Sequence, residues 1–124
     1  CLDTGHMAIG GVDTVKFAKE SADRVGHVHL KDVNMQITPE VLARQTSIMN
    51  GVQKGLFTPL GQGDVPIAEI IVALENAGYN GWYVIEQDTA ITGAVPADGA
   101  GPVESVSQSI NYLKDVVVPM LAKA

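Results

Sequence analysis

The stretch Gly26-His27-Val28-His29-Leu30-Lys31-Asp32 determines how the rest of the chain is interpreted. It has the length of a strand, and the side chains of a strand alternate between two faces. The two histidines and the lysine therefore share one face, and the valine and leucine share the other. In a parallel α/β barrel the apolar face packs against helices, and polar residues near the carboxyl end of the strand reach the catalytic face. The alternative is a half-exposed edge strand with two incidental histidines.

The composition is that of a globular chain. The 124 residues are 46% hydrophobic, and no run of about 18 apolar residues predicts a membrane span. The net charge of −6, with eight scattered Lys and Arg residues, counts against nucleic-acid binding and is compatible with a small neutral substrate or a divalent cation. The single cysteine cannot form an internal disulfide, which predicts a reducing, cytoplasmic location.

Hydrophobic spacing and turn residues predict alternating strands and helices. The predicted strands cover residues 1–3, 27–31 and 82–87, and the predicted helices cover 14–24, a segment starting at Thr38-Pro39-Glu40, 66–78 and 104–121. We expect a loop from Thr4 that carries His6, with further loops over 56–64 and 89–102, and a kink or helix end at Pro119.

This alternation predicts a parallel sheet with right-handed crossovers. Three strands cannot close a barrel that needs eight strands and typically about 250 residues. The chain also opens on Cys1, with a candidate site carboxylate only two residues later. We therefore expect it to be a piece of a longer polypeptide.

Three predicted strands each end in a possible metal ligand: Asp3, His29 and Glu86. Each residue alone has a structural explanation, as a turn cap, a core histidine or the partner of a lysine. Together they place two carboxylates and one imidazole at the edge where a barrel builds its site. This ligand set suits Mn²⁺, Co²⁺, Fe²⁺ or Mg²⁺. It lacks the cysteine thiolates that are typical of sulfur-rich zinc sites.

Several motifs carry a family resemblance. Residues 2–6 (LDTGH) and 22–32 (ADRVGHVHLKD) resemble the xylose-isomerase-like barrel superfamily of sugar isomerases and epimerases. Further segments are similar to one branch of this superfamily, the inosose dehydratases of myo-inositol catabolism. These segments are PEVLAR at 39–44, GLFT at 55–58, GQGD at 61–64, GYNGW at 78–82 and EQD at 86–88.

The resemblance implies an α/β fold, the C-terminal portion of a (β/α)8 TIM barrel with about three parallel strands and flanking helices. Residues 1–124 would be the C-terminal part of a single barrel domain whose N-terminal part is absent from this chain. In that family two glutamates, an aspartate and a histidine hold a divalent metal. Asp3, His29 and Glu86 match three of these positions, and the earlier glutamate would lie on a strand before Cys1.

The resemblance also implies roles in catalysis. His6 would contact substrate oxygens, with further polar contacts from Lys31 and Asp32. A divalent metal, Mn²⁺ or Co²⁺ ahead of Mg²⁺, Fe²⁺ or Zn²⁺, would stabilise an enolate while a carboxylate such as Glu86 removes the α-proton. If His6 or Lys31 then protonates a β-hydroxyl, water leaves and an inosose (a keto-inositol) is dehydrated to a diketone.

Other functions stay open from the sequence. The same machinery performs isomerisation or epimerisation of a ketose or inosose if the proton returns elsewhere on the substrate. A relative of the apurinic endonucleases is disfavoured, because those proteins use a histidine-rich zinc cluster and this acidic chain has three histidines. An inactive fragment is the remaining alternative. The expected partners are a small polyol or keto-sugar and the missing part of the barrel, or a second copy of the chain, but no nucleic acid and no membrane.

Overall fold

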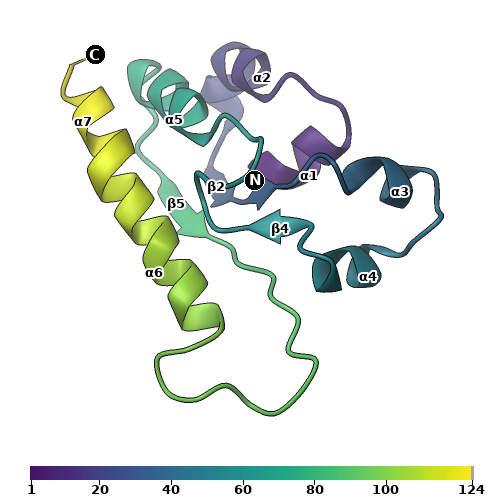
Figure 1. Cartoon of the computed structure of the whole chain (residues 1–124). Helices are drawn as coiled ribbons and strands as arrows, with labels where there is room; N and C mark the ends of the chain where they lie inside the picture. The colour runs from purple at the N-terminus through teal and green to yellow at the C-terminus, as the bar shows by residue number, and fades with distance from the viewer. Residues whose placement is uncertain (124) are drawn as a thin grey trace.

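The computed structural model describes residues 1–123, in which strands and helices alternate (Figure 1). The elements in chain order are β1 (Leu2–Asp3), α1 (Thr4–Ile9), α2 (Thr14–Ser21), the 3-10 turn η1 (Ala22–Arg24), β2 (His27–Leu30), β3 (Asp32–Val33), α3 (Thr38–Leu42), α4 (Ile48–Gln53), β4 (Phe57–Thr58), α5 (Ile67–Asn76), β5 (Trp82–Ile85), α6 (Pro102–Tyr112), the π-helical turn η2 (Leu113–Val117) and α7 (Val118–Leu121). The predicted α/β class is confirmed.

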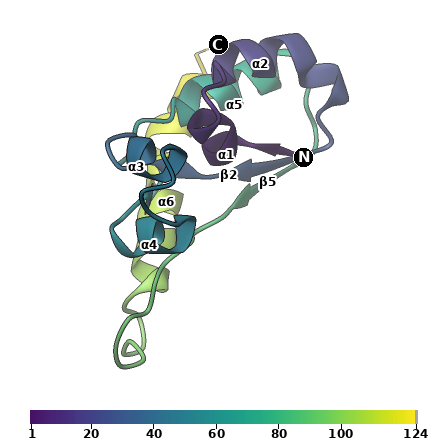
Figure 2. The ribbon, with the colours of Figure 1, turned by 90° about the vertical axis from the view of Figure 1, so that its right-hand side faces the viewer.

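A parallel sheet with the strand order β1-β2-β5 forms the centre of the fold. β1 pairs with β2 so that Asp3 lies opposite His29, and β2 pairs with β5 so that His27 lies opposite Trp82. Figure 2 shows β2 and β5 side by side. Because the three strands are parallel, their carboxyl ends meet at one edge of the sheet, and the residues that follow them are brought together there.

Helices cover one face of this sheet, and the core lies between. Val28 and Leu30 of β2 are fully buried, in one cluster with Ile67, Ile70 and Leu74 of α5. Burying each of these side chains contributes roughly 1.5–3 kcal/mol. α2 and α5 lie side by side above the sheet (Figure 1). The assignment of the apolar face of β2 to the helices is therefore correct, and its histidines lie on the opposite face.

The long excursion between β2 and α5 contains more structure than the sequence predicted. β3 and β4 pair as an antiparallel ribbon, and the one expected helix is two short ones, α3 and α4. Thr38 is not the cap, because Ile37 takes the N-cap position of α3 without a side-chain hydrogen bond. α4 is capped by Ser47, whose Oγ accepts the N–H of Asn50 at 3.1 Å. Two-residue strands show no periodicity, so a hydrophobic pattern does not reveal the ribbon.

The last helix runs as one column from α6 through η2 to α7 (Figure 1). Glu104 accepts the N–H of Gly101 at 3.1 Å and so fixes its start. The helix ends at Leu121, as the hydrophobic spacing predicted. Of the two alternatives predicted at Pro119, a kink or a helix end, the helix end does not occur there. Pro119 lies in the first turn of α7, and the regular α-helix is interrupted just before it by the π-helical turn. Residues 86–101 form a long loop that extends away from the sheet (Figures 1 and 2). Within residues 1–123, every helix is too short or too polar to cross a membrane.

Candidate metal centre

Three residues that the sequence singled out meet at the carboxyl edge of the sheet. Asp3 ends β1, His29 lies opposite it on β2, and Glu86 follows β5. Glu86 is held in place by its own N–H, which donates to the carbonyl of Leu30 at 3.0 Å and extends the pairing of β5 with β2. One ligand atom from each of the three side chains lies within 4.8 Å of the other two.

The arrangement of Glu86 and His29 is suited to a cation. Nδ1 of His29 lies 2.7 Å from Oε2 of Glu86, yet this buried oxygen has no hydrogen-bond partner among residues 1–123. The two atoms are therefore close without the geometry of a hydrogen bond between them. A buried carboxylate oxygen without a partner is costly, and a cation placed between the two atoms would satisfy both. Two carboxylates and an imidazole fit a divalent ion such as Mn²⁺ or Co²⁺.

Asp3 has two separate tasks. Its Oδ1 accepts the N–H of His6 at 2.8 Å and so caps α1. The loop predicted to start at Thr4 is therefore wrong, because the aspartate makes that segment the first turn of a helix. The other oxygen, Oδ2, faces the cluster and lies 3.9 Å from Nδ1 of His29. Capping leaves one oxygen of the carboxylate free for the site.

Lys31 lies beneath these carboxylates, and its side chain is only 1% exposed. Its Nζ lies 2.8 Å from Oδ2 of Asp88, 3.0 Å from Oε1 of Glu86 and 3.8 Å from Oδ2 of Asp3. Burial alone would lower the pKa of Lys31, but the hydrogen bonds to Asp88 and Glu86 and the charge of Asp3 raise it above its ordinary value. The ammonium therefore stays charged at neutral pH. Its predicted roles as an acid and as a substrate contact stay predictions, and its burial works against direct contact.

His6 is the most accessible of the predicted catalytic residues, with a side chain that is 53% exposed. Its Nδ1 lies 3.2 Å from Oδ2 of Asp3, and its ring meets the ring of Phe57 edge to face at 6.0 Å between centroids. An exposed imidazole beside the cluster is suited to contact a ligand. The predicted contact with substrate stays a prediction.

Asp32, which the sequence predicted to contact substrate, makes backbone hydrogen bonds in the structure. Its side chain is buried, and the carboxylate accepts four backbone N–H groups, from Val33, Gly61, Gly63 and Val65, at 2.9–3.0 Å. An oxygen pair that is filled by four donors has little capacity left for a ligand. Asp32 thereby anchors the glycine-rich segment 61–65 to the end of the central strand. Its predicted contact with substrate stays a prediction, and these hydrogen bonds work against it.

The sequence interpretation gave no role to Asp88, Thr4 or Phe57. Asp88 makes the shortest contact with the Lys31 ammonium, Thr4 bonds to the backbone of Lys31, and the Phe57 ring lies 4.7 Å from Nζ. A signal for Asp88 was present, since it is a carboxylate only two residues after the predicted ligand Glu86. Phe57 reaches the site only through the β3–β4 ribbon, which the sequence did not reveal.

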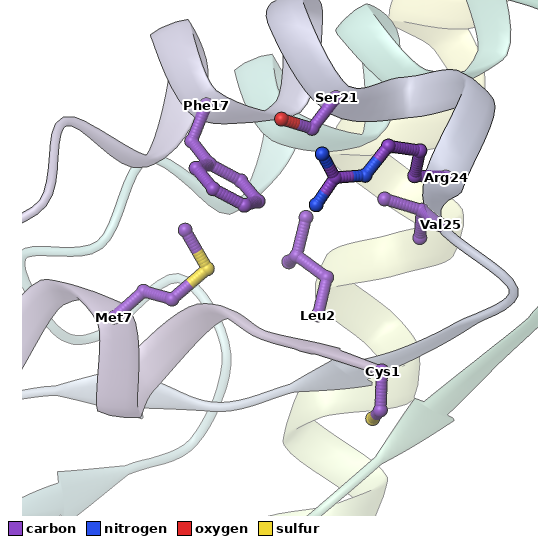
Figure 3. Close-up of a pocket in the computed structure, with 7 residues that line it drawn as sticks. All are labelled: Cys1, Leu2, Met7, Phe17, Ser21, Arg24 and Val25. Atoms are coloured by element: carbon purple, nitrogen blue, oxygen red, sulfur yellow. The ribbon is translucent and has the colours of Figure 1, made fainter.

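A pocket of about 330 Å³ lies elsewhere in the molecule, near the amino ends of β1 and β2. Figure 3 shows its lining, in which Met7, Phe17 and Leu2 face the same space from α1, α2 and β1, with Ser21 and Arg24 at the side. None of the residues that line it belongs to the cluster. In a barrel the site is built at the carboxyl ends of the strands, so this pocket is not the candidate site.

Comparison with known proteins agrees with this architecture. The chain is 34% identical over 115 residues to an inosose dehydratase of Geobacillus thermodenitrificans, an alignment that covers 91% of this chain and 36% of that protein. It is 35% identical over 116 residues to an inosose dehydratase of Clostridium perfringens, covering 92% of this chain and 36% of the relative. The chain thus spans little more than a third of the length of these curated relatives. No solved structure matches it.

The family comparison gives the fold directly. The family model described as "Xylose isomerase-like TIM barrel" matches residues 1–116. The match covers all three strands of the parallel sheet and α6, and it confirms the resemblance inferred from the sequence motifs. The chain belongs to the xylose isomerase-like TIM barrel family.

Proposed function

We propose that the protein containing this chain is a divalent-metal-dependent dehydratase that acts on inososes. The observation that carries the proposal is the convergence of Asp3, His29 and Glu86 at three neighbouring strand ends, with a buried Glu86 oxygen that lacks a hydrogen-bond partner among residues 1–123. The relatives named inosose dehydratases support the choice of substrate class. We expect the enzyme to work in the cytoplasm.

We further propose that residues 1–124 are the C-terminal part of a single barrel domain. Within the described chain, β1 and β5 each pair on one side only, and Trp82, on the face opposite the helices, is 76% exposed. A closed barrel would pair both edges and cover that face. The lengths of the curated relatives support the same conclusion. The remaining strands would come from elsewhere in the protein or from a second copy of the chain.

Asp3, His29 and Glu86 are the residues that would hold the cation, with Mn²⁺ or Co²⁺ as the expected ion and a further ligand from the rest of the barrel. When bound, the ion would polarise the ketone oxygen and stabilise the negative charge that develops as the neighbouring carbon loses its proton. The charge of Lys31 at 3.0 Å from Oε1 of Glu86 fixes the orientation of that carboxylate. The protein side of the site is thereby organised before substrate arrives.

The proton transfers are assigned to two residues. Glu86 accepts the α-proton, and His6 donates a proton to the β-hydroxyl, so that one water molecule leaves and the inosose becomes a diketone. Oδ2 of Asp3, at 3.2 Å from Nδ1 of His6, orients the imidazole ring beside the site. The half-exposed ring of His6 can reach a ligand, whereas the Lys31 ammonium is buried. His6 is therefore the better acid of the two that the sequence offered.

The test is to purify the protein, quantify bound metal, remove it with a chelator and restore Mn²⁺ or Co²⁺ before adding an inosose in deuterated water. We expect loss of one water molecule by mass spectrometry only in the presence of metal. Glu86→Gln should abolish both this loss and any exchange of the α-proton of the remaining substrate for deuterium. Glu20→Gln is the matched control, because Glu20 is exposed and its one ion pair within residues 1–123 is with Lys16, at 3.9 Å.

The alternative outcomes separate the competing functions. Deuterium uptake without loss of water would identify an isomerase or epimerase that uses the same residues. The absence of both, with metal bound, would contradict an enzymatic role of this kind.

A further inference from the structure

Lys31 brings a fixed positive charge into the proposed metal centre. Its Nζ lies 3.0 Å from Oε1 of Glu86, the other oxygen of the carboxylate whose Oε2 is free for a cation. Two cations that share one carboxylate repel each other, and each reduces the negative charge that the other experiences. The ammonium of Lys31 is therefore a competitor of the metal for Glu86, already in place when the metal arrives.

The ammonium is confined to this position from several sides. The hydroxyl of Thr4 bonds to both the N–H and the carbonyl of Lys31, at 2.9 and 2.8 Å. Gly5 leaves room for the stem, since a Cβ there would lie 2.7 Å from Cγ of Lys31. The face of Phe57 lies 4.7 Å from Nζ. These contacts keep the ammonium of Lys31 among the neighbouring carboxylates. Its effect on the metal centre therefore depends on which of these carboxylates it binds most strongly.

Asp88 is the carboxylate closest to this ammonium, at 2.8 Å, and it is not a member of the Asp3, His29 and Glu86 cluster. It lies just beyond β5 in the 86–101 loop, and its side chain is 42% exposed. A carboxylate that binds the ammonium of Lys31 without belonging to the ligand cluster offsets part of the positive charge that Glu86 experiences. Asp88 can therefore change the affinity of the site for the cation indirectly, through its ion pair with Lys31.

We propose that Asp88 is a positioning residue of the metal centre, which binds the ammonium of Lys31 and thereby leaves the carboxylate of Glu86 to a divalent cation. This inference rests on the proposed function, because it takes Asp3, His29 and Glu86 to be the cation site. It assigns opposite effects to the two partners. Lys31 lowers the affinity of the site for the cation, and Asp88 restores it.

Titration calorimetry with Mn²⁺ on the purified protein tests the proposal. Asp88→Asn should weaken binding by roughly tenfold, the lower end of the effect of residues that support metal ligands. Lys31→Met, which keeps the length of the stem, should bind Mn²⁺ more tightly than the wild type. In the Lys31→Met background, adding Asp88→Asn should change the affinity by less than about twofold, because the residue through which Asp88 acts is gone. Lys16→Met is the control for removing an exposed lysine.

A spectroscopic measurement separates positioning from coordination. The visible absorption of the Co²⁺-loaded protein should be unchanged by Asp88→Asn, because Asp88 is not a ligand. A changed spectrum, or the same loss of affinity with and without Lys31, would overturn the proposal. Asp88→Ser provides a second variant that also removes the charge, and an affinity equal to that of the wild type in both variants would overturn it too. If the wild-type protein itself binds neither ion, the proposed function fails, and the inference fails with it.

Discussion

Thr4 satisfies the backbone of Lys31 with a single hydroxyl, which accepts the lysine N–H at 2.9 Å and donates to the lysine carbonyl at 2.8 Å. Both residues are buried. Lys31 comes one residue after β2 ends, where α1 has already replaced a neighbouring strand on that side. The Thr4 hydroxyl thus makes the two backbone hydrogen bonds that a residue of β1 would make if the strand continued. The carboxyl end of β2 is thereby held in place.

Replacing Thr4 by valine should destabilise the protein by about 2–4 kcal/mol, because two buried backbone groups lose their partner at roughly 1–3 kcal/mol each. Thr4→Ser keeps the hydroxyl and should cost about 1 kcal/mol, the value of one buried methyl group. Urea unfolding followed by circular dichroism measures both variants. Equal stabilities of the valine and serine variants would show that the hydroxyl contributes nothing.

Gly5 matters for a steric reason that can be tested separately. Gly5→Ala brings a Cβ to 2.7 Å from Cγ of Lys31, so the lysine stem has to move and the contacts of its ammonium loosen. We expect a loss of about 1–3 kcal/mol, typical of overpacking, together with altered Mn²⁺ affinity. Gly26→Ala is the matched control, because a Cβ at Gly26 meets no atom within 4 Å. A Gly5→Ala variant as stable as the control would contradict the steric role.

The buried carboxylate of Asp32 yields a third prediction. Asp32→Asn replaces one carboxylate oxygen by an NH₂ group, which cannot accept the backbone N–H groups of the 61–65 segment. We therefore expect the free energy of unfolding to fall by about 2–4 kcal/mol, because buried donors lose their acceptor. Asp64→Asn should cost less, because in the described part of the chain the Asp64 side chain accepts one hydrogen bond, from the N–H of Met35. Thermal melts compare the two. A stable Asp32→Asn variant with a raised KM would contradict the anchoring role and support the substrate contact that the sequence predicted.

The success of the sequence interpretation depended on periodicity. Alternation placed Val28 and Leu30 in the core and the histidines on the other face, and the spacing of Ile67, Ile70 and Leu74 located α5. The residues Asp3, His29 and Glu86 were located by one rule, that the carboxyl ends of parallel strands meet. Features that follow from the periodic spacing of residues within strands and helices are therefore the part of the fold that can be predicted from a single sequence.

The parts that were missed depend on local exceptions and on tertiary contacts. α1 forms because Asp3 caps it, although Gly5 reads as a helix breaker. The β3–β4 ribbon is two residues long on each side, too short for any pattern, and it is what brings Phe57 to Lys31. The anchoring role of Asp32 was missed, because nothing in the sequence shows that its carboxylate accepts backbone N–H groups of the 61–65 segment.

Alkaline pH should destabilise the protein through Tyr83. Burial, and then the hydrogen bond that its hydroxyl donates to Glu75 at 2.8 Å, raise the pKa of Tyr83 far above its usual value. In the unfolded chain the phenol ionises near pH 10, whereas the folded protein keeps the proton. The stability linked to Tyr83 is therefore fully present below about pH 10 and declines as the pH rises further.

The measurement is the unfolding free energy in urea between pH 8 and pH 11. Tyr83→Phe should show a shallower decline with pH than the wild type, since the linked proton is gone. Some slope should remain, because burial also raises the pKa of Tyr79 and of Tyr112. Identical slopes for wild type and variant would mean that Tyr83 does not control this loss.

Trp82 provides a direct readout of whether the sheet is completed by other strands. It is the single tryptophan of the chain, it lies on the sheet face opposite the helices, and its side chain is 76% exposed. If residues 1–124 are part of a larger barrel, the isolated chain should aggregate, self-associate or stay bound to the missing strands, because an open sheet edge and an uncovered apolar face favour association. Light scattering after size exclusion gives the mass, and the emission of Trp82 should move to shorter wavelength as that face becomes covered. A monodisperse 13 kDa monomer with a cooperative melt and solvent-exposed tryptophan emission would show that three strands suffice, and the barrel-completion proposal would then be wrong.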